Sequence, residues 1–412
     1  MLRIIPRPRY KLYLNTKIMM LIIRKIITGK VYRGKCVKEF EEKFRKYINT
    51  KYALCTPMAR TALYLLLISL NLKKNDEVIV TPYTVADVIN MVILADLKPV
   101  FVDIDYTYNM DPKKIESKIT KRTKVVLLTH LFGQPCDIDK INAIAKKHNL
   151  ITIEDCAQAC GAEYRKKKVG GLCDFGYFSF SSYKNVTTFY GGIITTNNKG
   201  MIEKIKRKVE KYPYPPVFML SKRILRDILL FVMTSKLVFP VTYVLISVVN
   251  LFDDTFIDRF LSTKIVLRKK MPPEYEIKYT NLQAAIGLEQ LKRVDKGNQR
   301  RIQNAMYYNE NLKDLKQIKI PKNIDNVKNT YLNYPVLYKN RKVLLKKLFK
   351  AGIDSTVGNL PNCAELEVFK DYKSSCPVCS KVVKEVFYLP IQPQVKKSQL
   401  KYIVNCIKKF LK

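Results

Sequence analysis

The sequence predicts an α/β protein: a large domain on a mostly parallel sheet, followed by a smaller α+β domain. Between residues 36 and 200, apolar runs of strand length alternate with segments of helix length. The runs are continuously apolar, as in parallel strands that are covered on both faces. From residue 282 onward long helical patterns dominate instead. A chain of 412 residues is also long for one compact domain.

In the first half, spacing and capping residues predict the helices. Residues 34–44 have apolar side chains at helical spacing, and residues 59–70 carry almost no charge, which predicts a buried helix. Further helices are expected within 85–95, 111–119 and 137–148, where Asp111-Pro112 and Asp137 are good helix starts. The strands expected between and after these helices are 78–80, 99–103, 124–128, 150–154, 175–180 and 192–196.

Residues 213–270 interrupt this alternation. A proline-rich entry at 212–216 leads into a strongly apolar stretch at 228–252, which contains Lys236 and Pro240 and has basic residues on both sides. The pattern leaves three hypotheses open: a helical pair buried in a dimer interface, a hairpin that dips into a membrane surface through residues 219–252, or a membrane span. A span would separate the two halves of the molecule across a bilayer, which argues against it.

The second half predicts the smaller domain. Helical patterns cover 282–312 and 342–351, a last helix begins near Lys397, and strand-like runs occupy 330–337 and 386–389. We therefore expect a large domain at 33–270, with an apolar insertion at about 213–270, and a small domain at 271–412 that packs with residues 1–32. The apolar run at 17–23 ends at Arg24 and Lys25, so a secretory signal is not expected.

Charge and cysteine content limit the partners. The 75 Lys and Arg residues outnumber 35 Asp and Glu, which gives a formal net charge of +40. This charge has three readings: a bias of composition, a membrane-surface role or nucleic-acid binding, and no recognisable nucleic-acid motif supports the last. The ten scattered cysteines predict reduced thiols in a cytoplasmic protein. Cys376 and Cys379 have zinc spacing, but no second such pair accompanies them, so no metal site is expected.

Two residues in the first half suggest chemistry together. Asp155 follows the strand at 150–154, and open α/β sheets bind ligands at the carboxyl ends of their strands. Lys184 follows the strand at 175–180, in a hydroxyl-rich turn before Gly191 and Gly192. Pyridoxal chemistry needs a lysine for the Schiff base and a carboxylate that keeps the pyridine nitrogen protonated. It also needs hydroxyls and backbone amides for a phosphate.

Several ordered motifs resemble the DegT/DnrJ/EryC1/StrS family of sugar aminotransferases. They lie at 76–80, 99–105, 130–135, 153–159, 176–180, 183–188, 191–197 and 282–288. The resemblance covers the chain from about residue 33, except for 213–270. It implies the pyridoxal-phosphate fold type I, with a mostly parallel seven-stranded sheet in the large domain. It also implies a homodimer with its sites at the subunit interface.

The resemblance assigns roles to individual residues. Lys184 matches the Schiff-base lysine and Asp155 the partner of the pyridine nitrogen. Gln158 matches the residue beside the ring hydroxyl of the cofactor, and Ser179 matches a phosphate ligand. The helix start at Ala59 and Arg60 matches the backbone phosphate cradle. Because some family members with a dehydratase activity carry histidine at the lysine position, Lys184 favours transamination.

Three positions depart from the family pattern. Met58, Ala59 and Arg60 replace the usual Ser-Gly-Thr, and Arg60 either contacts the phosphate or points into solvent. Val85 replaces an aromatic residue that stacks on the cofactor, with Tyr83 nearby. Glu276 stands near the position of an asparagine that reaches the phosphate of the neighbouring subunit.

The expected function is amino transfer, with glutamate as donor, to a keto group of a nucleotide-activated sugar in polysaccharide or glycan biosynthesis. Two alternatives stay open. The three departures motivate a catalytically impaired regulator or scaffold. The apolar stretch motivates an enzyme that is peripheral at the membrane and acts on a lipid-linked sugar.

Overall fold

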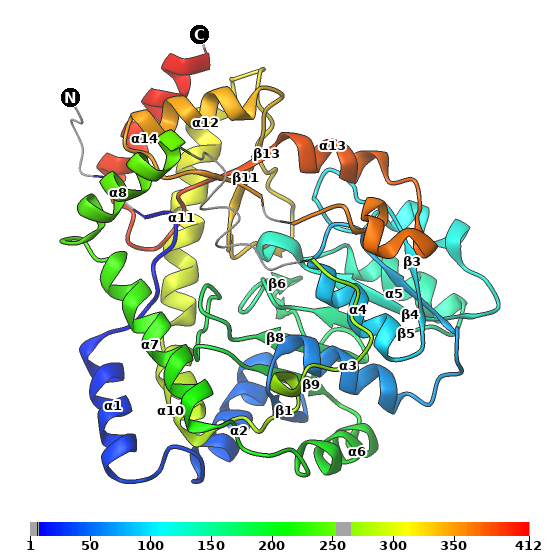
Figure 1. Ribbon diagram of the computed structural model, residues 1–412. Helices are drawn as coiled ribbons and strands as arrows, with labels where there is room; N and C mark the ends of the chain where they lie inside the picture. Colours follow the sequence, from blue (N-terminus) through cyan, green and yellow to red (C-terminus); the bar gives the residue numbers. More distant parts are fainter. Residues whose placement is uncertain (1–5, 7, 253–264, 359, 412) are drawn as a thin grey trace.

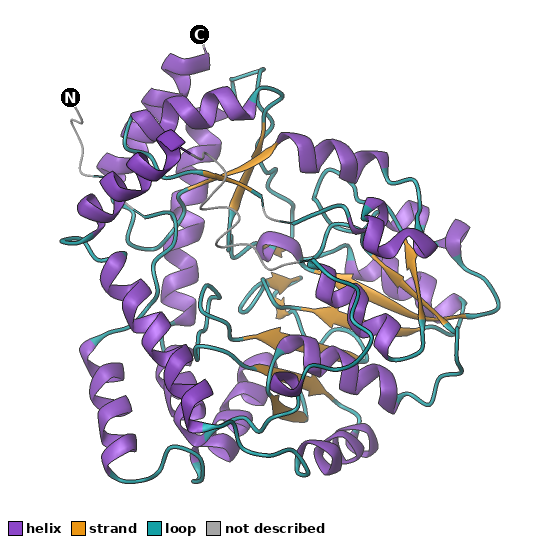
Figure 2. Ribbon diagram, viewed as in Figure 1, coloured by secondary structure: helices purple, strands orange, loops and turns teal. Residues whose placement is uncertain are grey.

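The centre of the molecule is a seven-stranded sheet in the order β1-β9-β8-β5-β4-β2-β3 (Figures 1 and 2). The structure is a computed structural model that describes residues 6, 8–252, 265–358 and 360–411. Neighbouring strands from β8 to β3 are parallel, and β9 runs antiparallel to both of its neighbours, so the sheet is mostly parallel as predicted. The strands are β1 (Tyr52–Thr56), β2 (Glu77–Val80), β3 (Lys98–Phe101), β4 (Thr123–Thr129), β5 (Ile151–Asp155), β8 (Phe175–Ser179) and β9 (Gly192–Thr196).

Helices cover both faces of this sheet, which explains why its strands are continuously apolar. Alternate strand residues pack into two separate hydrophobic cores. One core includes α3 (Ala59–Ser69), α4 (Ala86–Leu94), α6 (Lys199–Val209) and α13 (Pro377–Glu385). The other includes α2 (Cys36–Ile48), α5 (Ile138–Lys147) and α10 (Asn281–Leu291).

A second, antiparallel sheet of three strands lies in the C-terminal part of the chain. It consists of β11 (Tyr334–Leu337), β13 (Val386–Leu389) and β12 (Thr356–Val357). A third core packs this sheet against α11 (Val294–Leu312), α12 (Arg341–Lys350) and α14 (Lys397–Leu411). A small sheet joins β10 (Val327–Lys328) to the hairpin of β6 (Glu163–Tyr164) and β7 (Lys167–Lys168), so the two halves of the chain are hydrogen-bonded together. The domain division at residue 270 stays a prediction.

Two expected elements differ in the structure. Residues 111–119 form two short 3-10 turns, η1 (Pro112–Lys114) and η2 (Glu116–Lys118), and not one helix. Asp111 caps the first turn as expected, and Pro112 and Ile115 are buried, but the 3-10 hydrogen bonding ends after each short turn. The strand expected at 330–337 begins only at Tyr334, because Tyr331 has a left-handed backbone with φ of 46°. The remaining 3-10 turns are η3 (Leu131–Gly133), η4 (Pro273–Tyr275), η5 (Cys363–Glu365) and η6 (Glu367–Tyr372).

The insertion contains two helices, α7 (Val217–Met233) and α8 (Phe239–Phe252), and its residues 253–264 lie outside the described part. The N-terminal helix α1 (Thr16–Ile27) packs against α7 and α10 through a fourth core that includes Ile18, Leu220 and Ile286. Among the described residues, no helix combines the length and apolar content that crossing a bilayer requires. The membrane-span hypothesis therefore has no helix to support it there.

Candidate active site

Lys184 and Asp155 are brought to the same edge of the large sheet. Asp155 ends β5, and its parallel neighbour β8 pairs with it in register at Tyr177. The chain leaves β8 after Ser179 and turns, with the Lys184 amide donating to the Ser181 carbonyl (3.1 Å). Both side chains thus come from the carboxyl ends of adjacent parallel strands, where open α/β sheets bind ligands.

Burial changes the basicity of Lys184. Loss of water around the amine lowers its pKa from 10.5 to about 8, and the positive charge of Arg60 acts in the same direction. The negative charge of Asp155 opposes this shift. An amine with a pKa near 8 is partly unprotonated at neutral pH, so it can act as a nucleophile and can exchange protons.

Asp155 is buried, with 5% of its surface exposed. Burial raises its pKa, while hydrogen bonding and the nearby positive charge of Lys184 favour its ionised form. One of these bonds is donated by the Ala157 amide to Oδ1 (2.9 Å). The site therefore contains a desolvated carboxylate and a desolvated amine that interact with each other. The carboxylate suits a cationic ring nitrogen of a ligand, and the amine suits a carbonyl group.

The start of α3 provides the second part of the site. Its N-cap residue, Met58, makes no side-chain cap, and the first turn holds no acidic residue, so its first amides stay available to an anion. Gly192 on β9 lies directly against this turn: a Cβ there would stand 2.6 Å from the Ala59 nitrogen. The absence of a side chain therefore lets β9 pack directly against the start of α3, and any side chain here would displace that turn.

Gln158 and Ser179 lie at the same edge of the sheet. Gln158 follows Asp155 by one turn and its Oε1 accepts from the Phe132 amide (3.1 Å), which leaves its NH₂ group to donate. Ser179 ends β8, and its hydroxyl lies 3.4 Å from that of Ser181. The amide NH₂ group and the hydroxyl can both donate hydrogen bonds to oxygen atoms of a ligand.

Comparison with known proteins identifies the kind of site. The model of the DegT/DnrJ/EryC1/StrS aminotransferase family matches residues 15–212 and 258–408. The chain belongs to this family. A dTDP-3-amino-3,6-dideoxy-alpha-D-galactopyranose transaminase of Aneurinibacillus thermoaerophilus is 30% identical over 390 residues, which cover 94% of this chain and 93% of the relative. A GDP-perosamine synthase of Caulobacter vibrioides is 43% identical over 174 residues, which cover 42% and 47%.

Solved structures show the same fold. PseC of Helicobacter pylori, an aminotransferase involved in the biosynthesis of pseudoaminic acid, superposes with a TM-score of 0.79 over 98% of this chain and 99% of its own, at 21% identity. The predicted fold type I is therefore confirmed for this DegT/DnrJ/EryC1/StrS aminotransferase. The family uses pyridoxal phosphate, and a relative from Streptococcus pneumoniae has been solved in PLP and PMP forms.

Arg60 binds protein groups in this aminotransferase. Its guanidinium forms an ion pair with Asp87 and donates to the Tyr275 hydroxyl (2.5 Å). Arg268, at the exit of the insertion, also binds Asp87 (2.8 Å). Burial disfavours the charge on Asp87, but Arg268 and Arg60 outweigh this effect and lower its pKa. Because Arg60 is shared between these partners, backbone amides of α3 remain the stronger candidates for a phosphate.

The other two departures from the family pattern are also visible. Val85 is the N-cap residue of α4 and is 47% exposed, whereas Tyr83 is fully buried with its ring against Phe132. Tyr83 is thus a core residue and does not replace the missing aromatic side chain. Glu276 follows the turn η4. Burial raises the pKa of Tyr64 and of Tyr212, and the negative charge of Glu276 adds to both shifts.

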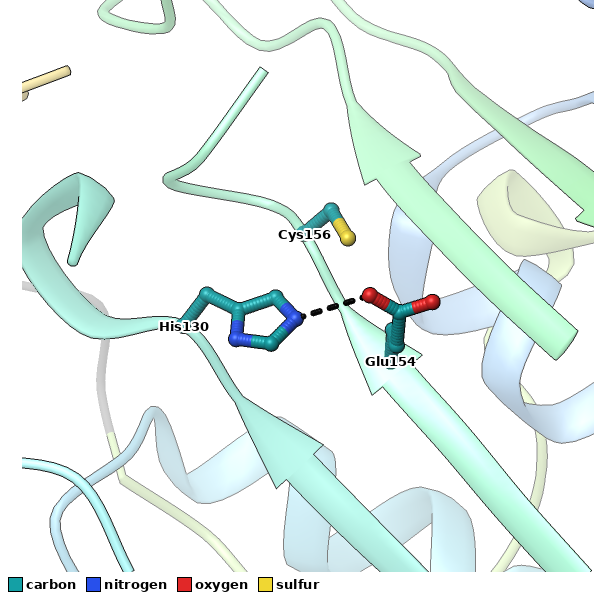
Figure 3. A group of neighbouring side chains, drawn as sticks. All are labelled: His130, Glu154 and Cys156. Carbon is teal, nitrogen blue, oxygen red and sulfur yellow. Dashed lines mark hydrogen bonds and ion pairs between the residues drawn. The ribbon is translucent and has the colours of Figure 1, made fainter. Parts of the chain in front are cut away.

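A buried polar cluster of His130, Glu154 and Cys156 lies at the ends of β4 and β5 (Figure 3). His130 Nε2 lies 3.0 Å from Glu154 Oε2, and His130 Nδ1 accepts from the Cys136 amide (3.1 Å), so Nε2 carries the proton. The Glu154 carboxylate also accepts from the amides of Gly170, Leu172 and Cys173 at 2.7–3.0 Å. These four donors satisfy the carboxylate without an ion, so Glu154 anchors the loop that leads into β8.

The insertion reaches the loop that carries Lys184. Asp227 on α7 is fully buried, and its Oδ2 accepts from the Ser182 hydroxyl (2.6 Å). Arg226 donates to the same hydroxyl (3.0 Å) and to Oδ1 of Asp227 (2.8 Å). Since Ser182 stands two residues before Lys184, α7 fixes the backbone of the lysine turn.

We therefore expect Asp227→Ala to lower kcat/KM of amino transfer by about tenfold, because displacement of a reacting group by less than 1 Å already costs such factors. Asp227→Asn keeps an acceptor for Ser182 and should recover most of this loss. The pH at which the bound cofactor's visible spectrum titrates should shift in Asp227→Ala, which a purely structural role would not cause. Glu203→Ala, which removes an exposed acid on α6, is the matched control. Equal kinetics and titration in Asp227→Ala and wild type would contradict this role.

Proposed function

We propose that this aminotransferase uses pyridoxal phosphate to move an amino group from glutamate to a keto group of a nucleotide-activated sugar. The observation that carries the proposal is that Lys184 and buried Asp155 lie close enough for each charge to act on the other, with Arg60 of the uncapped start of α3 also acting on Lys184. Relatives named as nucleotide-sugar transaminases support the substrate class, and a role in polysaccharide or glycan biosynthesis follows from it.

The residues divide the work by position. When bound, pyridoxal phosphate supplies an electron sink for the carbon that loses its proton. Lys184 would supply the amine that holds the cofactor and would move the proton at that carbon. Asp155 would hold the proton on the ring nitrogen, Gln158 would donate to the ring hydroxyl oxygen, and Ser179 would bind the phosphate together with the first amides of α3.

Three further features fit this function. A net charge of +40 favours the approach of a nucleotide diphosphate. Val85 at the start of α4 is exposed, so it is accessible to a neighbouring subunit in the homodimer that the family resemblance implies. All ten cysteines are free and eight are buried, which suits a reducing cytoplasm.

The test is the visible absorbance of the purified chain after addition of pyridoxal phosphate. We expect a yellow species that glutamate bleaches, and that returns when a GDP-, dTDP- or UDP-linked keto sugar is added. The sugar that restores the colour fastest identifies the nucleotide. Bleaching by another amino acid but not by glutamate would refute the donor. Binding of the cofactor without bleaching by any amino acid would favour the regulator or scaffold, and would reject the enzyme.

A further inference from the structure

The helices of the insertion expose an apolar surface on one side of the molecule, where α1, α7 and α8 lie (Figure 1). On α7 it includes Phe218 (75% exposed), Leu225 (67%) and Leu229 (55%). It continues through Leu237 (88%), between the helices, to Val241 and Leu245 on α8. We call these six residues the outer apolar face. Large apolar side chains are most often buried, so a surface on which several of them gather indicates a binding site for a partner.

The outer apolar face is held on a fixed support. On the opposite side of α7, Leu220 packs into the core with α1 and Asp227 binds Ser182. On the opposite side of α8, Tyr243 stacks on Phe349 of α12 with ring centroids 4.6 Å apart. The two helices are therefore anchored by one side and apolar on the other. Their exposed side needs a separate explanation, because packing within the described chain does not use it.

Basic side chains lie among and beside the residues of this face. Lys222 is exposed one turn after Phe218, with its amine over the Phe218 ring, and Arg226 is exposed on the flank of α7. Lys236 is exposed in the link to α8, and Arg24 is exposed on the adjacent α1. Within residues 213–252 the acidic residue is Asp227, which is buried underneath and bonded to Arg226 and Ser182. The described surface thus combines exposed apolar side chains with basic ones among and beside them.

We propose that the outer apolar face rests on an anionic lipid bilayer, with α7 and α8 lying in the plane of its surface. Apolar side chains of such helices enter the boundary of the acyl chains, and lysine and arginine bind the anionic headgroups. Neither helix meets the requirements for a span, in accordance with this placement. A second copy of the chain fits less well. A two-fold contact would bring the same basic side chains against each other, with no exposed acid in 213–252 to compensate them.

This inference goes beyond the proposed function and does not depend on it, because lipid binding requires neither cofactor nor turnover. It has a consequence for position: Asp227, on the buried side of α7, joins the docked helix to the turn that holds Lys184. The site would therefore work close to the headgroups.

The test is flotation of the full chain with vesicles of phosphatidylcholine, with and without phosphatidylglycerol. The wild type should float with the anionic vesicles and less with the neutral ones, and added salt should weaken the binding. The variant Leu225→Ser/Leu229→Ser/Val241→Ser/Leu245→Ser should lose at least about tenfold in affinity. Lys222→Glu/Lys236→Glu should lose the preference for anionic vesicles. The matched control Met306→Ser/Val343→Ser removes two equally exposed apolar residues (57% each) outside this face and should bind as the wild type does.

Thermal unfolding of each variant checks that it is folded, and the substituted residues are all exposed, so little change is expected. The proposal is overturned if the wild type does not float with anionic vesicles, or if the four-serine variant floats equally well. Sedimentation tests the remaining explanation, which is that a second copy of the chain covers this face. If the four-serine substitution turns a dimer into a monomer while no form binds vesicles, a second copy covers this face.

Discussion

Replacing Lys184 by alanine should abolish amino transfer, with a loss in kcat/KM of at least about 10⁴-fold. The substitution removes the amine that burial makes partly unprotonated at neutral pH, with a pKa of about 8. Lys184→Arg is the stricter control, because it keeps a positive charge beside Asp155 but cannot give up its proton. Both variants should lack the yellow species, as seen by absorbance, while circular dichroism stays unchanged. Transfer at more than roughly a hundredth of the wild-type rate in Lys184→Ala would show that the chemistry does not use this residue.

The same residue predicts a pH dependence of stability without cofactor. Folding lowers the pKa of Lys184 from 10.5 to about 8, so between these pH values the unfolded chain binds more protons than the folded one. Burial of Lys184 therefore costs stability below pH 8, and this cost is relieved as the pH rises toward 10.5. Lys184→Met removes the cost, so it should be more stable than the wild type at pH 7, with the difference shrinking above pH 8. Urea unfolding at a series of pH values measures this, and a constant difference would contradict it.

The strands that carry the site were predictable because each is a continuous apolar run. Asp155 and Lys184 follow two such runs, and the family resemblance joined them into one site. β1 was not predicted: Tyr52–Thr56 is a short run at the edge of the sheet, and its pairing with β9 comes from distant sequence. The helix expected at 111–119 was wrong because a good cap and apolar spacing start a turn but do not decide whether a short segment continues as an α-helix or as 3-10 turns.

Contacts between distant segments could not be predicted. From the sequence, Arg60 either contacts a phosphate or points into solvent. In the structure it binds Asp87, 27 residues away, and Tyr275, 215 residues away. Asp227 interrupts an apolar stretch without any signal that it would meet Ser182. Glu154 offered a weak signal: side chains alternate along a strand, so the residue before Asp155 must point to the opposite, covered face. A carboxylate buried there needs donors, which His130 and the loop at 170–173 provide.

Replacing Asp155 by asparagine should separate function from stability. We expect kcat/KM to fall roughly 10³-fold, because an amide cannot hold a proton on the ring nitrogen of the cofactor. Stability should not fall, since burial already raises the pKa of Asp155 and so makes its charge costly. The free-energy cost of burying the Asp155 charge is absent below the ordinary pKa of 3.8, and it grows as the pH rises from there through the raised pKa. Any gain in stability should therefore appear near neutral pH and vanish in acid.

Glu154→Gln is the matched control, one residue away in the same strand. Its carboxylate accepts from three backbone amides and from His130, and the amide nitrogen of glutamine would face one of these donors. We expect a loss of about 3 kcal/mol in the free energy of unfolding, with kcat of the folded fraction changed far less. Unfolding in urea and steady-state kinetics on both variants provide the comparison. If Asp155→Asn is as unstable as Glu154→Gln, or stays within tenfold of wild-type activity, Asp155 is a structural residue and the proposed partner of the ring nitrogen is wrong.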